Sequence, residues 1–186
     1  NVFVSNLAPH PQPNFCQYGS KIWQHSLSTG NIAKQLILMS GHKAQSAQGY
    51  LIGLVCNLGD MIIYQLMTDA FAHVHPDCQA NSYAIKELLI GQAKRLTYSI
   101  AKYWHFPVSI LSALALQAKI TKASALMTLF QQNPIACYVY EANLISELLI
   151  RYDGKTIDSD YLKQAAQKLI YSEQAKGYLL QQVPSE

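Results

Sequence analysis

One short segment of the sequence has the side chains of a metal site. It contains His73, His75, Asp77 and Cys78, and imidazole, carboxylate and thiolate groups are the ligands that zinc prefers in proteins. No second ligand pair such as a CxxC motif accompanies them, and the proline and aspartate within the segment favour a loop. We therefore interpret residues 73–78 as a solvated loop between two helices, with a metal site as the alternative.

A second pair of polar residues, Cys56 and Asn57, lies in the otherwise apolar stretch 53–59. This stretch predicts a buried helix that is closed by Gly59, followed by a helix that Asp60 caps. We interpret Cys56 as a small buried side chain, because the sequence shows no cationic neighbour that would lower the pKa of its thiol. Asn57 is expected to cap or bridge the helix ends.

His25 is a third candidate, because it falls on the apolar face of a predicted helix. The spacing of residues 21–40 is helical and places His25 with Thr29, Ile32, Leu36 and Met39. Such a histidine is either a metal ligand or a core residue with a hydrogen-bond partner. Since buried polar groups need partners more often than they bind metals, we expect a hydrogen bond to Asn57 or Asn143.

The rest of the chain also has helical spacing, and no segment shows the alternation typical of a strand. Pro107 and Pro134 suit the first turns of two helices, and Asp158 or Ser159 suits the start of the last one. The expected buried stripe of helix 83–103 is Leu89, Ala93, Leu96, Ile100 and Tyr103 or Trp104. The prediction is an all-α, compact bundle of seven or eight helices at residues 21–40, 48–57, 60–71, 83–103, 107–118, 134–151 and 159–171, the last continuing towards residue 181.

The first twenty residues differ from the rest. Pro9, Pro11 and Pro13 occupy every second position, which forbids a helix there and favours an extended chain. We interpret residues 1–20 as a linker or the end of a missing upstream segment, and residues 21–186 as one helical domain with C-terminal helices.

The composition limits the classes of partner. Apolar residues make up 50% of the chain and charged residues 13%, about half the usual charged share, so we expect a further face to be buried against another domain, a protein partner or a second copy. The net charge is only +3, and the one adjacent basic pair, Lys94-Arg95, is interpreted as a solvated helix face, so no nucleic-acid partner is expected. The apolar runs are too short for a membrane span, so no membrane partner is expected either.

The spacing of the four cysteines indicates in which cellular compartment the protein is expected. Cys16, Cys56, Cys78 and Cys137 are widely spaced, and the sequence does not start with a signal peptide. Reduced thiols in a cytoplasmic protein are the expected state.

The order of four motifs resembles a known family. Residues 22–27 hold a Trp-x-His-Ser-Leu pattern, residues 53–59 a Gly-Leu-x-x-x-x-Gly pattern, and residues 103–107 a Trp followed by Pro, while residues 138–144 include an Ala-Asn step. Over about residues 15–147 the chain is similar to the HDOD domain, a bacterial signalling-output relative of the HD phosphohydrolases, although it omits the N-terminal helical portion usual in that family. The resemblance implies an all-α bundle of the HD/HDOD type.

In the HD phosphohydrolases, histidines and aspartates from several helices hold divalent metals that activate water for attack on a phosphate. The resemblance aligns His25 with the first histidine and Asn143 with an Asp-or-Asn position. It also aligns Cys56 and Asn57 with the His-Asp pair, and Ala93 and residues 116–117 with further histidines of many relatives. One imidazole and one thiol do not make a hydrolytic metal centre. The resemblance therefore implies a vestigial pocket made by His25, Cys56, Asn57, Ala93 and Asn143, with no catalytic residue, no bound metal and no other cofactor.

Three functions follow as hypotheses. The first is a non-catalytic signal-transduction domain that acts through protein–protein contacts, as a monomer or a homo-oligomer. The alternatives are a metal-dependent phosphohydrolase or phosphodiesterase with an atypical ligand set that includes a divalent metal, and a nucleotide-binding sensor without turnover.

Overall fold

The computed structural model describes residues 15–72, 82–120 and 126–182, and the elements in these ranges are all helical. The all-α prediction is therefore confirmed, with no strand in the described ranges. In chain order, the helices are α1 (Phe15–Met39), the 3-10 helix η1 (Lys43–Gln45), α2 (Ser46–Val55), α3 (Leu58–Ala72), α4 (Ser82–Tyr103), α5 (Val108–Gln117), α6 (Leu126–Gln132), α7 (Pro134–Asp153), α8 (Ser159–Leu169) and α9 (Glu173–Gln181).

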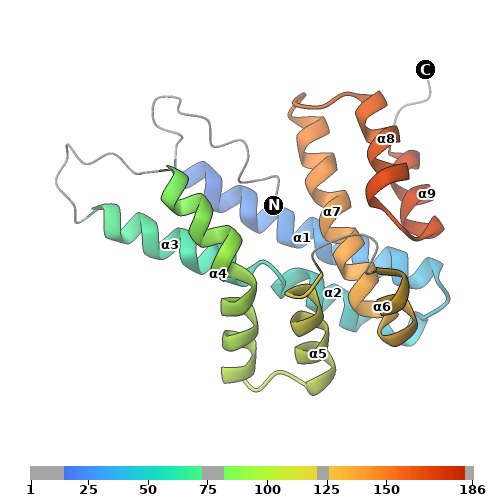
Figure 1. The fold of residues 1–186 in the computed structure, drawn as a ribbon, viewed down its shortest axis with the longest axis horizontal. Helices are drawn as coiled ribbons and strands as arrows, with labels where there is room; N and C mark the ends of the chain where they lie inside the picture. Colours follow the sequence, from blue (N-terminus) through green and yellow to red (C-terminus); the bar gives the residue numbers. More distant parts are fainter. Residues whose placement is uncertain (1–14, 73–81, 121–125, 183–186) are drawn as a thin grey trace.

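Helices α1 and α7 form the centre of the bundle. The pair α3–α4 extends from one side of this centre, and α8 and α9 lie against α7 on the other (Figure 1). The main core joins α1, α2, α5, α7, α8 and α9 through fully buried aliphatic side chains, among them Leu36, Ile52, Val139, Ile145, Leu162 and Leu179. Such a core can hold side chains of α1, α7 and the α2–α3 turn in fixed positions.

Two glycines allow the close helix contacts that shape this core. A Cβ atom on Gly53 would lie 2.8 Å from the Cα atom of Gly30, so α2 packs directly on the backbone of α1. A Cβ atom on Gly59 would lie 1.9 Å from the carbonyl oxygen of Ala93, so α3 packs in the same way on α4. Only a residue without a side chain fits at either position.

The role of Gly59 differs from the prediction. Helix α2 ends at Val55, Cys56 and Asn57 form the turn, and Gly59 lies inside the first turn of α3. Asp60 is likewise inside α3, in its first turn. The sequence pattern indicated the break between two helices correctly, but the glycine is needed for the approach to α4 and not for ending α2.

Other helix boundaries also differ in detail. Helix α1 begins at Phe15, two residues after the last N-terminal proline, so residues 15–20 of the predicted linker are helical, whereas residues 1–14 lie outside the described residues. Gly91 does not interrupt α4. Pro107 precedes α5 as its N-cap, and α6 lies where no helix was predicted.

The C-terminal helix follows its capping residues. Asp158 accepts a hydrogen bond from the backbone N–H of Tyr161, at 2.8 Å, and caps α8 as predicted. Ser172 caps a separate helix, α9, so the predicted continuation towards residue 181 is a second helix and not an extension of the first.

The predicted buried stripe of α1 is correct except at its end. That of α4 is correct for Leu89 and Ala93, but Leu96 and Ile100 are only partly buried. The buried row of α4 continues through Thr97 and Ala101 instead. Met39 is 48% exposed, because it is the last residue of α1 and the chain turns away at Gly41, where φ is +85°. Tyr103 and Trp104 are 79% and 54% exposed, since they lie at the corner between α4 and α5 on the surface.

Candidate functional site

The five predicted pocket residues come from four elements of the bundle. His25 lies on α1, Cys56 and Asn57 form the α2–α3 turn, Ala93 lies on α4 and Asn143 on α7. Asn143 joins three of them: its Oδ1 accepts a hydrogen bond from Asn57 Nδ2 at 2.9 Å and a longer one from Cys56 Sγ at 3.7 Å, and its side chain also hydrogen-bonds His25. Ala93 supplies no side-chain donor and forms the floor under Gly59.

His25 is a buried neutral histidine. Its Nδ1 lies 2.8 Å from Ser146 Oγ, and this hydroxyl also donates to the His25 carbonyl at 3.3 Å. Burial and, to a smaller extent, the nearby charge of Lys94 lower the pKa of His25 to about 4, although the hydrogen bond with Asn143 acts in the opposite direction. The expected partner Asn143 is present. Ser146, one helical turn further along α7, was not anticipated.

Cys56 is a protonated thiol at neutral pH. Its side chain is buried, and Sγ donates to the Gly53 carbonyl at 3.2 Å. Burial raises the pKa of this thiol to about 11, although the charge of Lys94 acts in the opposite direction. A thiol in this state is neither a good nucleophile nor a thiolate ligand. The interpretation of Cys56 as a small buried residue therefore agrees with the geometry.

Lys94 belongs to this site, which the sequence analysis missed. Its Nζ donates to Asn57 Oδ1 at 2.9 Å and to the Cys56 carbonyl oxygen at 3.2 Å. The prediction of a solvated face is thus wrong for Lys94 and correct only for its exposed neighbour Arg95. The available signal was its position directly after Ala93, beside the buried stripe of α4.

Two further polar residues complete the surroundings. Thr97 Oγ1 on α4 accepts a hydrogen bond from the backbone N–H of Gly59 at 2.8 Å, which holds the start of α3 against α4. The same hydroxyl donates to the carbonyl oxygen of Ala93 at 3.0 Å. Asp60 on α3 has a raised pKa because of burial, while attraction to Lys94 lowers it, and its buried Oδ2 makes no hydrogen bond with the described residues. The site therefore contains one ammonium and one buried carboxyl group.

These residues do not fit a hydrolytic divalent metal. The groups at the matched positions are an imidazole bonded to serine, a protonated thiol and two amides that bond each other. The described ranges contain no cluster of three His, Cys, Asp or Glu side chains with metal-site geometry. An ammonium group beside Asn57 would also repel a divalent cation. The other candidate, with His73, His75 and Cys78, lies outside the described residues and stays a prediction.

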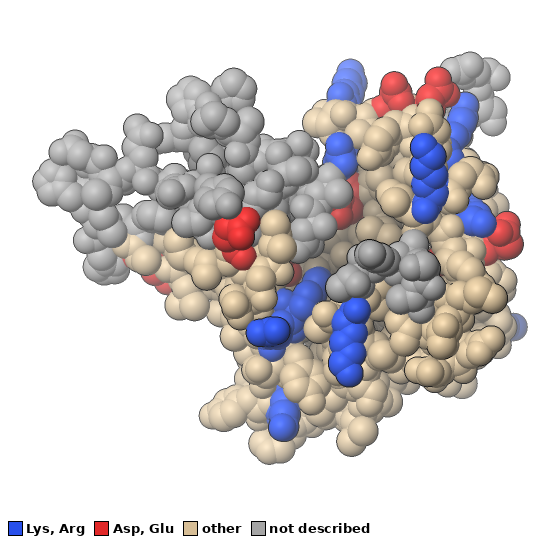
Figure 2. Space-filling model, viewed as in Figure 1, with Lys and Arg blue, Asp and Glu red and all other residues tan. Residues whose placement is uncertain are grey.

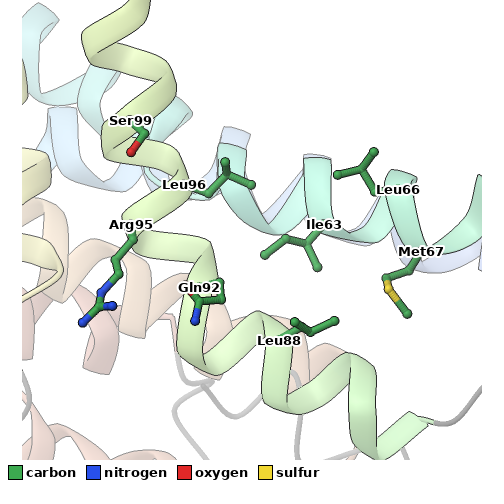
Figure 3. A pocket seen from close by; sticks show the side chains of 8 residues that line it. All are labelled: Ile63, Leu66, Met67, Leu88, Gln92, Arg95, Leu96 and Ser99. Carbon is green, nitrogen blue, oxygen red and sulfur yellow. The ribbon is translucent and has the colours of Figure 1, made fainter. Parts of the chain in front are cut away.

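A separate apolar groove lies between α3 and α4, on a different face of α4 from Lys94. Figure 3 shows the aliphatic side chains of the two helices facing each other, with Arg95 at one edge. The groove has a volume of about 390 Å³. Its lining residues are Ile63, Leu66, Met67, Leu88, Gln92, Arg95, Leu96 and Ser99.

One stretch of the described residues, Lys43–Met67, is long and apolar enough to cross a membrane by length and composition alone. In the fold this stretch is divided into α2 and α3 by the Cys56-Asn57 turn. Ile52, Cys56 and Asn57 within it are buried against other helices. In the fold, 39% of its apolar window is buried.

Of the comparisons with known proteins, the one with protein-family models gives a match. No curated protein and no solved structure shows significant similarity to the chain. A family model described as the HDOD domain matches residues 7–120, more than half of the 186 residues. The match contains the positions of His25, Cys56, Asn57 and Lys94, and it ends before α7, which supplies Asn143 and Ser146. With its all-helical fold and this match, the chain belongs to the HDOD domain family.

Proposed function

We propose that this chain is a non-catalytic regulatory domain that acts in the cytoplasm through contacts with a protein partner. The observation that carries the proposal is that the side chains at the metal-ligand positions bind each other. Asn57 is bonded to both Lys94 and Asn143, and His25 to Ser146. A phosphohydrolase of this type needs open coordination positions for water and substrate, and these groups leave none of the required ligands available.

The surface supports a role in protein contacts. Among the described residues, uncharged side chains cover most of the lower half of the face seen in Figure 2. Leu66 and Leu88 in the groove are 60% and 40% exposed, and Ile90 on the same helix is 46% exposed. Two helices with facing aliphatic rows form a surface that suits a third, amphipathic helix. Arg95 forms no ion pair with the described residues and would match an acidic side chain on that helix.

The experiment that tests the first half of the proposal is a hydrolysis assay. The purified protein is incubated with cyclic dinucleotides and nucleotides in Mn²⁺ or Mg²⁺, and His25→Ala serves as the matched variant. We expect no turnover above the level of His25→Ala. Metal-dependent turnover that His25→Ala abolishes would show that the pocket is catalytic and would refute the proposal.

The contact surface is tested with a photo-crosslinking amino acid placed at Leu88 and, as a control, at the exposed Leu169 of α8. Crosslinks to a protein partner are expected from position 88 only. The charge reversal Arg95→Glu should reduce their yield, whereas the reversal Lys163→Glu on α8 should not. Equal yields from both crosslinker positions, or no effect of Arg95→Glu, would argue against the groove as the docking surface.

A further inference from the structure

Lys94 has the contacts of a bound cation. Its side chain reaches from α4 to the α2–α3 turn, where one amide oxygen and one backbone carbonyl oxygen accept its hydrogen bonds, at 2.9 and 3.2 Å. Both acceptors are oxygens of the turn that resembles the metal-binding pair of the HD phosphohydrolases. Amide and carbonyl oxygens are also ligands that hard cations use.

The other groups of the pocket respond to this cation. Burial is the main cause of the lowered pKa of His25, and the nearby charge of Lys94 lowers it further. Burial raises the pKa of the Asp60 carboxyl group, and the charge of Lys94 opposes that rise. The positive charge of Lys94 thus acts on Asp60 against the effect of burial and disfavours a second positive charge at His25. A fixed ammonium thus supplies positive charge in the pocket where a metal ion would otherwise do so.

The amide at position 57 suits a pocket of this kind. Asn57 accepts from Lys94 through Oδ1 and donates to Asn143 through Nδ2, so one side chain contacts both the cation and a second acceptor. An aspartate could accept from the ammonium but could not donate to Asn143. Asn57 therefore offers an acceptor to Lys94 and a donor to Asn143 with a single neutral side chain.

We infer that the ammonium group of Lys94 replaces the divalent metal in this pocket and joins the α2–α3 turn to α4 in its place. The inference deepens the proposed function, because a covalently attached cation stabilises the same helix junction but leaves no open coordination position. It has two consequences that can be measured separately: the folded state depends on Lys94, and restored metal ligands are ineffective while Lys94 is present.

The first consequence is tested by thermal unfolding of Lys94→Met, which keeps the length of the side chain and removes its charge. Loss of the ammonium leaves two oxygens without a partner, so the unfolding midpoint should fall by about 5 °C or more. The control Lys34→Met changes an exposed lysine of α1 and should have little effect. Equal midpoints for the two variants would overturn the inference.

The second consequence is tested with Mn²⁺ alone, by calorimetry and by the shift of the unfolding midpoint. The wild-type protein and the double variant C56H/N57D should not bind Mn²⁺, whereas the triple variant C56H/N57D/K94A should bind it and unfold at a higher temperature in its presence. Binding by the double variant as tight as by the triple variant, or a folded triple variant without binding, would overturn the inference. If the triple variant does not fold, the comparison of Lys94→Met with Lys34→Met decides.

The two proposals fail in different ways. Metal-dependent hydrolysis by the wild-type protein would refute the non-catalytic function whatever the effect of Lys94→Met. A normal midpoint for Lys94→Met would refute the role of the ammonium and leave the hydrolysis result unchanged.

Discussion

Acidification should destabilise this protein through His25. The imidazole is 7% exposed, and burial, with the charge of Lys94, lowers its pKa from 6.5 to about 4. In the unfolded chain the same ring takes up a proton near pH 6.5. Between these two values the unfolded state therefore binds one more proton than the folded state, and the stability contributed by the neutral ring is lost as the pH falls.

The magnitude follows from the difference between the two pKa values. One proton of difference changes the free energy of unfolding by about 1.4 kcal/mol per pH unit. Lowering the pH from 7 to 5 covers about 1.5 units of this window and should cost about 2 kcal/mol, rising to about 3 kcal/mol below pH 4. Burial of Asp60 and Glu141 raises the pKa of each carboxyl group, and a raised carboxyl pKa acts in the opposite direction at low pH.

The assay must therefore isolate His25 from the carboxyl groups. Urea denaturation at pH 7, 6 and 5 is compared between the wild-type protein and His25→Gln, which retains hydrogen-bonding groups but does not titrate. The difference between the two proteins should change by about 2 kcal/mol from pH 7 to 5. An NMR titration of the His25 ring should give a pKa near 4. Parallel pH profiles, or a ring that titrates near 6.5, would refute the reasoning.

Three further predictions concern packing and thiol chemistry. Gly59→Ala should lower the free energy of unfolding by about 3 kcal/mol or more, because the added Cβ atom meets the α4 backbone. Gly91→Ala, where the Cβ atom has open space, should raise the free energy of unfolding by about 0.5–1 kcal/mol. Urea denaturation of both variants and the wild-type protein measures the two changes. Glu141→Ala leaves two backbone N–H groups and one hydroxyl at the start of α9 without their acceptor, so amide exchange in α9 should accelerate, and unchanged exchange would contradict this role. Cys56 and Cys137, whose thiol pKa values burial raises to about 11 and 12, should react with iodoacetamide at pH 8 only after unfolding, as peptide mass spectrometry would reveal.

The sequence by itself determined the helical character of this protein and the turn that contains Cys56 and Asn57. Local spacing of apolar residues and capping residues such as Asp158 are sufficient for that purpose, because helix formation depends on neighbours within a few positions. The order of motifs also pointed to the HDOD family, which the family match confirms.

Local sequence spacing could not predict which residues at the helix ends are buried, or the role of Gly59. Met39 and Tyr103 follow the apolar period of their helices and are nevertheless exposed, since each is the last residue of its helix, where the chain turns away. Gly59 has the sequence appearance of a helix stop. Its function is a contact with α4, and a contact between two helices has no local signal.

Only the tertiary structure decided the chemistry of the pocket. Lys94 has the sequence context of a solvated lysine, yet packing of α4 against the α2–α3 turn places its ammonium on Asn57. Ser146 and Asn143 reach His25 only because α7 crosses α1. Hydrogen-bond partners and pKa shifts depend on distances between side chains that are far apart in the chain. These distances are fixed by the packing of the helices and not by the pattern within any one of them.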